Sequence, residues 1–196
     1  MQNNWRLKRE DLLKEDEWAK LKNYLDQKAS TGFKTFVQDA AICRVLVWTG
    51  LRRSELADLK ISDLHLDESN PYLIVRNGKG GKYREVLITP ECCSFLANWI
   101  KERSGYLFVP QRNDKYTGDG IYRVWKTALK DALLPPRSVH KARHYYATKL
   151  HDATKDLKFL QEQLGHSSLN VTQVYTHITE SQANKYLSDF DKKLQG

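Results

Sequence analysis

The apolar and polar positions along the chain predict a mainly helical protein. In most segments apolar residues recur every three or four positions, which is the spacing of a helix with one buried face. The segment 33–48 differs because its C-terminal half is apolar on almost every side, and this predicts the central buried helix. By these criteria we predict helices over residues 14–28, 33–48, 54–59, 90–102, 120–133, 139–153, 157–164 and 180–194. Gly50 is the expected C-terminal cap of the second helix, because glycine adopts the left-handed backbone needed there.

The pattern changes between residues 62 and 88 to short runs rich in β-branched and aromatic residues. Two such runs, residues 72–75 and 84–88, flank a glycine-rich turn at 78–81, which predicts a β-hairpin within a small sheet. A brief extended segment is expected at residues 106–109. The predicted fold class is therefore α+β, mainly α-helical with a small antiparallel β-sheet.

Composition favours a compact domain with a polyanionic partner. The 196 residues can form one domain with a sizeable core, and 32 Lys and Arg against 24 Asp and Glu give a net charge of +8. Many basic domains bind no nucleic acid, so charge alone does not decide the partner. The three cysteines, two of them adjacent, favour a reducing, intracellular environment, and we assign them no chemical role. Without an apolar run of about 20 residues or a signal-peptide core, we expect no membrane association and a cytoplasmic location, associated with the nucleoid.

His140 and Arg143 stand three residues apart on a predicted helix, so their side chains emerge on one face. Arginine offers a planar set of donors for phosphate oxygens, and histidine can transfer a proton near neutral pH. On its own, the pair is more typical of an exposed basic helix than of a catalytic site. A zinc site at His140 and His144 is disfavoured, because the zinc-protease signature has glutamate after the first histidine and this chain has Lys141.

Two further candidates follow near the C-terminus. Gly165 is expected to end a helix in a left-handed turn, which places His166 at that turn. Tyr175 is the candidate nucleophile, but a free phenol has a pKa near 10 and needs cationic or proton-accepting neighbours to react at neutral pH. Taken alone, both residues are also compatible with purely structural roles.

The hairpin turn supplies a candidate general acid. Lys79 has a flexible stem that could carry its ammonium group to a leaving oxygen, with Lys82 as the second choice. Lys82, Lys101 and Arg84 could equally contact a phosphate backbone. The turn lacks the residue spacing of the phosphate-binding loop found in ATPases and GTPases, so no bound nucleotide is implied.

Four segments in this order, residues 49–59, 77–86, 140–150 and 164–177, resemble the conserved boxes of the tyrosine recombinase family, also called phage integrases. The similarity is closest to Xer-like and integrase-like members, and it extends from about residue 12 to residue 194. It implies that residues 12–196 are the catalytic domain. Residues 1–11 would then be an N-terminal extension or linker remnant, and the family's N-terminal core-binding domain would be absent.

The resemblance also implies a set of site residues. The catalytic residues would be Arg52, Lys79, His140, Arg143, His166 and Tyr175. Glu55 would be the acidic residue that orients the arginine and histidine of the site. The expected DNA-binding residues are Lys82, Arg84 and Lys141. No metal, nucleotide or other cofactor is implied. The departures from the family pattern are mild: Ala142 stands where leucine is usual, preceded by Lys141, and Val171 replaces a common threonine.

By the same resemblance, the expected function is site-specific recombination of double-stranded DNA through a 3′-phosphotyrosyl intermediate, by a tetramer assembled through its C-terminal helix. The apolar stripe of segment 180–194 could instead fold back onto its own domain, and the sequence leaves both arrangements open. Alternatives are relaxation of DNA in the manner of a type IB topoisomerase, and a non-catalytic DNA-binding module. An RNA-binding role is disfavoured because we find no aromatic stacking motif.

Overall fold

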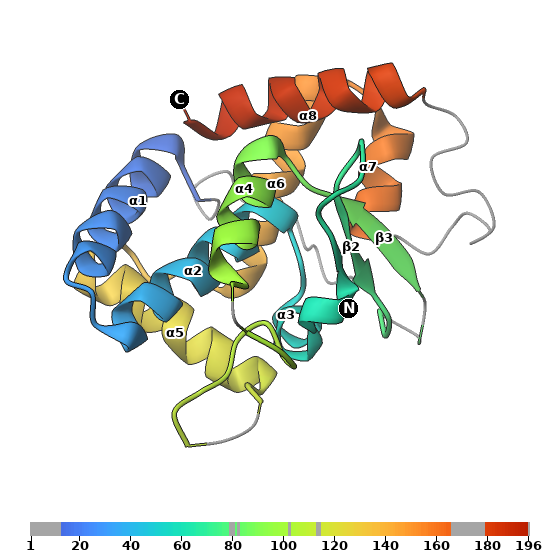
Figure 1. Ribbon diagram of the computed structural model, residues 1–196. Helices are drawn as coiled ribbons and strands as arrows, with labels where there is room; N and C mark the ends of the chain where they lie inside the picture. Colours follow the sequence, from blue (N-terminus) through green and yellow to red (C-terminus); the bar gives the residue numbers. More distant parts are fainter. Residues whose placement is uncertain are drawn as a thin grey trace, which may run out of the picture.

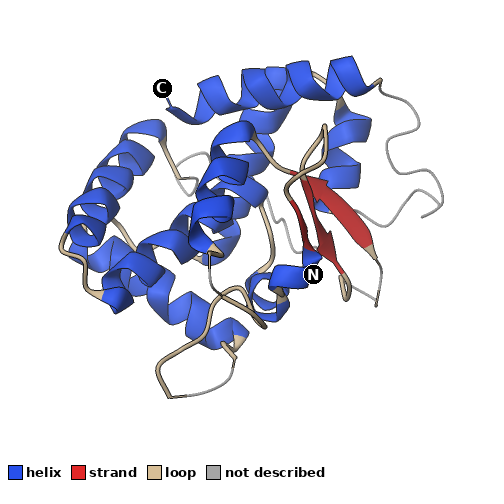
Figure 2. Cartoon of the chain, viewed as in Figure 1, coloured by secondary structure: helices blue, strands red, loops and turns tan. Residues whose placement is uncertain are grey.

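The computed structural model describes residues 13–78, 81, 83–101, 103–112, 115–165 and 179–195. The helices are α1 (Glu15–Ser30), α2 (Lys34–Thr49), α3 (Arg53–Asp58), α4 (Pro90–Trp99), α5 (Gly118–Asp131), α6 (Val139–Thr154), α7 (Leu157–Leu164) and α8 (Glu180–Gln195), with a short 3₁₀ helix, η2 (Ile61–Asp63). The strands are β1 (Leu64–His65), β2 (Tyr72–Val75) and β3 (Arg84–Leu87). This architecture confirms the predicted fold class, and Figure 2 shows the strands gathered at one side of the helices.

The three strands form an antiparallel sheet in the order β1-β2-β3. The predicted hairpin is confirmed, with Tyr72 opposite Leu87 and Val75 opposite Arg84. Side chains alternate between the two faces, so Val75, Arg84 and Val86 are all directed to the buried face. Helix α7 packs against β3, and this contact brings the C-terminal half of the chain to the sheet (Figure 1).

Helix α2 is the centre of the core. Residues 40–49 are buried almost without interruption, because α1, α5 and α6 all pack against this helix (Figure 1). Gly50 ends α2 with a φ of +60°, which confirms the predicted cap. A Cβ atom at this position would collide with the ring of Tyr146 on α6. Glycine therefore allows the chain to leave α2 beneath that ring and to begin α3 directly afterwards.

Most helices begin or end one to three residues away from the predicted positions, and two of these differences have a clear local cause. Helix α4 ends at Trp99, three residues before the predicted end at residue 102. The chain turns back after Trp99, and the indole of this residue donates a hydrogen bond to the Leu107 carbonyl at 3.1 Å. Helix α5 begins at Gly118, because the Thr117 hydroxyl accepts a hydrogen bond from the Gly120 amide at 3.0 Å and caps the helix. Such caps are local contacts that hydrophobic periodicity does not reveal.

The segment expected to be extended at residues 106–109 is not part of the sheet. Tyr106 forms a single bridge with Lys60, and the Leu107 amide donates to the Leu59 carbonyl at 2.8 Å. Because the segment pairs with the loop after α3, it fixes the position of that loop.

Helix α8 packs on its own domain. It lies across α6 and α4 at the top of Figure 1, with Ala183, Leu187, Phe190 and Leu194 buried. The Phe190 ring meets that of Tyr146 edge-on, with centroids 5.1 Å apart. Of the two arrangements that the sequence leaves open, this is the one in which the stripe folds back.

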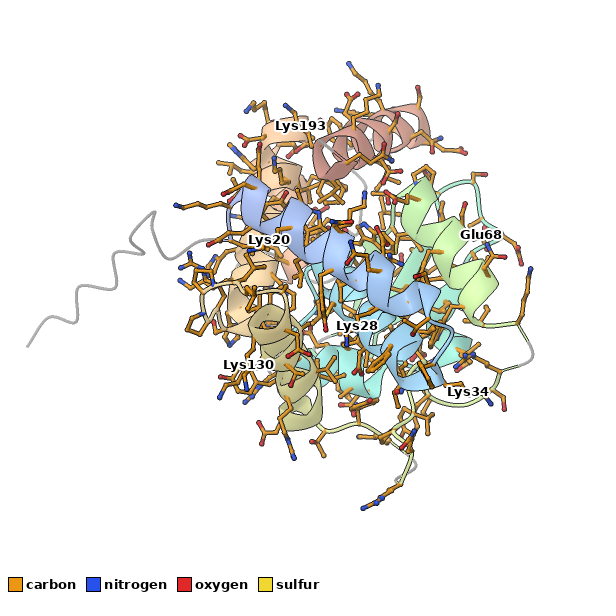
Figure 3. The ribbon with its side chains drawn as sticks, turned by 90° about the vertical axis from the view of Figure 1, so that its left-hand side faces the viewer. Lys20, Lys28, Lys34, Glu68, Lys130 and Lys193 are labelled. Carbon is orange, nitrogen blue, oxygen red and sulfur yellow. The ribbon has the colours of Figure 1, made fainter. Side chains whose placement is uncertain are left out.

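Positive charge is spread over the outer surface. Figure 3 shows Lys20 and Lys28 on α1, Lys34 at the start of α2, Lys130 on α5 and Lys193 on α8 at the outside of the ribbon. None of the helices within the described ranges is long and apolar enough to cross a membrane.

Replacement of Phe190 by alanine should lower the free energy of unfolding by about 3 kcal/mol, because the ring is 1% exposed and its loss leaves a cavity between α8 and α6. Urea unfolding measures the change. The matched control is Phe33→Ala, at a ring that is 66% exposed, where the change should stay within about 0.5 kcal/mol. Equal effects at the two positions would show that α8 is not packed on its own domain in solution.

Candidate active site

The start of α3 positions the first pair of functional side chains. Arg52 precedes the helix in extended conformation, and Glu55 is the third residue of its first turn. Glu55 Oε2 accepts a hydrogen bond from the Arg52 amide at 2.8 Å, in the manner of a capping box, and Oε1 accepts one from Arg52 Nη1 at 2.6 Å. The sequence from Gly50 to Glu55 thus ends one helix, begins the next and directs Arg52 beside a buried carboxylate.

Arg84 binds the same carboxylate from the sheet. Its Nη1 and Nη2 donate to the two oxygens of Glu55 at 2.9 and 2.8 Å, and its Nε donates to the Gln163 carbonyl at 3.1 Å. Arg84 was expected to contact DNA, but the structure places it beneath the site, 7% exposed. The physical reason is its register: position 84 lies on the same face of β3 as buried Val86, and all three of its guanidinium nitrogens bind within the protein.

Arg143 reaches the cluster from α6. Its Nη1 donates to the Gly50 carbonyl at 2.7 Å and its Nη2 to the Leu164 carbonyl at 2.5 Å. These carbonyls lie at the C-terminal ends of α2 and α7, where a cation is favoured. Arg143 Nη1 is 4.0 Å from Glu55 Oε2. The structure therefore brings Arg52, Glu55 and Arg143 together, as the sequence predicted.

The electrostatics of this cluster favour a bound anion. Burial would raise the pKa of Glu55, but hydrogen bonds and positive charge from Arg84, together with Arg52, outweigh it and hold that pKa at about 2. Burial, and then the charges of Arg52 and Arg84, lower the pKa of Arg143 to about 10, so it remains a cation at neutral pH. Three guanidinium groups thus surround one carboxylate, and the excess positive charge suits a phosphate.

His140 lies one helical turn before Arg143 on α6 and is exposed. Lys141 beside it is partly buried. Burial, followed by repulsion from charged neighbours that include Lys141 and Arg143, lowers the pKa of His144. Among the described residues, no three His, Cys, Asp or Glu side chains lie close enough together to share a metal ion.

Four of the expected site residues, Lys79, Lys82, His166 and Tyr175, lie outside the described residues, and their roles remain predictions. The elements beside them are described. Strand β3 begins with Arg84, and α7 ends at Gly165, whose φ of +66° confirms the predicted left-handed turn. The first residue of β3 therefore belongs to the arginine cluster, and the turn that ends α7 touches it.

A cleft of about 280 Å³ borders the cluster on the side of the hairpin, and its lining includes Glu55, Lys60, Arg76, Tyr106 and Lys115. The ammonium groups of Lys60 and Lys115 lie 5.4 and 5.6 Å from the centre of the Tyr106 ring. Two lysines thus lie near one aromatic ring beside the site, and Lys115 also pairs with Asp58.

Sequence comparison assigns the family. A family model described as the phage integrase family matches residues 11–182. The chain belongs to the phage integrase family. It is similar to the tyrosine recombinase XerA of Pyrococcus furiosus, with 36% identity over 152 residues, covering 74% of this chain and 52% of that protein. It is also similar to the tyrosine recombinase XerD of Oceanobacillus iheyensis, with 35% identity over 182 residues, covering 87% of this chain and 59% of that protein.

Solved integrase-family structures share the fold. The crystal structure of XerA recombinase aligns with a TM-score of 0.68 at 34% identity, covering 87% of this chain and 60% of that one. The XerH site-specific recombinase bound to its difH substrate aligns with a TM-score of 0.66 at 28% identity, covering 87% of this chain and 52% of that one. The family assignment from the sequence is confirmed. The chain spans somewhat more than half the length of these relatives.

Replacement of Glu55 by glutamine should destabilise the protein in a pH-dependent way. The pKa of Glu55 is about 2 in the folded protein, against an ordinary value of 4.5, so its stabilisation is present above pH 4.5 and is lost as the pH falls toward 2. We expect Glu55→Gln to cost about 3 kcal/mol at pH 7 and progressively less below pH 4.5.

Urea unfolding of the two proteins at pH 7, 5 and 3.5 measures this difference. Asp189→Asn is the control, because the pair between Asp189 and Lys192 is exposed and its loss should change stability little at any pH. A cost for Glu55→Gln that stays constant from pH 7 to pH 3.5 would contradict the assigned role of the carboxylate.

Proposed function

We propose that the chain supplies the catalytic domain of a site-specific DNA recombinase, which cleaves and rejoins double-stranded DNA through a 3′-phosphotyrosyl intermediate. The observation that carries the proposal is the geometry around Glu55: Arg52 and Arg143 are held together at one point, with an excess of positive charge. The relatives support it, since they are tyrosine recombinases and the XerH structure contains a difH substrate.

In the proposed reaction Arg52 and Arg143 bind the non-bridging oxygens of the scissile phosphate. The charge on these oxygens grows as the pentavalent transition state forms, and guanidinium groups already in position stabilise it. Arg52 Nε and Nη2 and Arg143 Nε make no hydrogen bond to any of the described residues. These donors are the ones we assign to the phosphate.

The bond changes are assigned to residues of the family pattern. The Tyr175 hydroxyl oxygen attacks phosphorus and forms the phosphotyrosyl bond, while the bond to the 5′-oxygen breaks. His140 accepts the phenol proton, Lys79 donates a proton to the departing 5′-oxygen, and His166 donates a hydrogen bond to the phosphate. The 5′-hydroxyl of a partner strand then attacks the intermediate and restores both the phosphodiester and the free tyrosine.

DNA contacts are proposed around this centre. Lys82 and Lys141 lie next to cluster residues in the sequence, and Lys60 in the neighbouring cleft adds positive charge that a phosphate backbone would neutralise. We assign residues 12–196 to the catalytic domain and residues 1–11 to an extension or linker. A separate core-binding domain would close the other side of the DNA.

Strand exchange requires several protomers, and we propose a tetramer on DNA that acts on the nucleoid in the cytoplasm. Assembly through the C-terminal helix requires α8 to leave its own domain, because the apolar stripe that would dock is buried against α6 and α4. DNA binding would therefore have to stabilise the form of the protein in which α8 is released from its own domain.

The expected covalent intermediate gives the direct test of this function. The protein is incubated in EDTA with nicked suicide duplexes whose arms are randomised, so that no target sequence has to be known, and the products are separated on a denaturing gel. We expect a covalent protein–DNA band for the unmodified chain and none for Tyr175→Phe, because phenylalanine lacks the attacking oxygen.

Tyr24→Phe is the matched control, since the Tyr24 hydroxyl bonds to Asp131 on α5 and lies outside the site. It should form the band at the normal rate. A band that persists in Tyr175→Phe would contradict the assignment of the nucleophile. DNA binding without any band from the unmodified chain would favour a non-catalytic DNA-binding module.

A further inference from the structure

Arg84 connects three elements that are distant in the sequence. It begins β3, it binds both oxygens of Glu55 on α3, and its Nε binds the carbonyl of Gln163 near the end of α7. With 8% of its side chain exposed, it is the least accessible arginine of the cluster. Each nitrogen of this guanidinium therefore fixes one atom of the surrounding site.

The first consequence concerns the charge of the site. Arg84 binds Glu55 through two parallel hydrogen bonds, the strongest geometry for such a pair. The carboxylate is thereby held 4.0 Å from Arg143, which donates to the carbonyls of Gly50 and Leu164 instead. Without Arg84, Glu55 would remain bonded to Arg52 but could shift toward Arg143, pair with it directly and cancel positive charge that the phosphate needs.

The second consequence concerns the turn after α7. A Cβ atom on Gly165 would lie 2.8 Å from Arg84 Cδ, so the backbone of this glycine rests directly on the arginine stem. Gly165 is followed at once by His166. The same side chain therefore supports the left-handed turn that ends α7.

Stability alone gives little reason for this arrangement. A buried arginine–carboxylate pair loses so much hydration that apolar residues of similar volume often stabilise a fold as well or better. The benefit of Arg84 is better explained by the positions that it gives to its neighbours.

We propose that Arg84 is a positioning residue for strand cleavage. It holds Glu55 4.0 Å from Arg143, which leaves that guanidinium available to the phosphate, and it supports the left-handed turn at the end of α7. This inference rests on the proposed function. It assigns to Arg84 no contact with DNA.

The test measures single-turnover cleavage and DNA affinity separately. The unmodified chain, Arg84→Met and Arg84→Lys are compared on the suicide duplex that the unmodified chain selects, and dissociation constants are measured in the Tyr175→Phe background. We expect Arg84→Met to lower the cleavage rate constant about 100-fold through misplacement of the site. The dissociation constant should change less than about threefold, because Arg84 offers DNA almost no surface. Arg84→Lys keeps the charge but not both hydrogen bonds to Glu55. Its cleavage rate constant should lie between those of the unmodified chain and Arg84→Met.

A double-mutant cycle with Glu55→Gln tests whether Arg84 acts through the carboxylate. In that case Glu55→Gln together with Arg84→Met should cleave no more slowly than the slower single variant. Arg44→Gln is the control for burial: Arg44 is 16% exposed and pairs with Asp26 on α1, away from the cluster. It should lower the melting temperature and leave the cleavage rate constant unchanged.

Several results would overturn the inference. These are a normal cleavage rate in Arg84→Met, a parallel loss of rate and affinity, or fully additive effects in the cycle. If circular dichroism shows that Arg84→Met does not fold, Arg84→Lys decides: a loss of about tenfold or more supports the inference, and a smaller loss refutes it. Failure of the proposed function is distinct, since the unmodified chain would then form no covalent band in the same gel.

Discussion

The site depends on one buried carboxylate. Glu55 accepts hydrogen bonds from Arg52 and Arg84 and lies 4.0 Å from Arg143, so groups from α3, β3 and α6 meet around a single negative charge. Three guanidinium groups this close would otherwise repel one another. The buried carboxylate reduces this repulsion and so permits the cluster, while three cations against one anion leave the site with a net positive charge.

The fold supplies the remaining constraints through helix ends. Gly50 ends α2 under Tyr146 and offers its carbonyl to Arg143, while Leu164 at the end of α7 offers a second carbonyl to the same guanidinium. A cation held by the negative ends of two helices keeps its charge and loses its freedom to move. The positions of α2, α6 and α7 in the core therefore determine the position of Arg143.

The pattern of apolar residues predicted the helices and the hairpin, and the resemblance to the tyrosine recombinase family implied the roles of Arg52, Glu55 and Arg143. Neither predicted the burial of Arg84, which lies on the same face of β3 as Val86. Ion pairs between distant elements have no periodic signature. The cap at Thr117 was missed for a similar reason, since it depends on one local hydrogen bond. Lys79, Lys82, His166 and Tyr175 stay predictions, because they lie outside the described residues.

The most direct test of the central claim is a crystal structure of the Tyr175→Phe variant bound to its selected duplex. We expect Arg52 and Arg143 each to lie within about 3 Å of a non-bridging oxygen of the same phosphate, while Arg84 still binds both oxygens of Glu55. A phosphate held by neither arginine, or a Glu55 paired directly with Arg143, would contradict it.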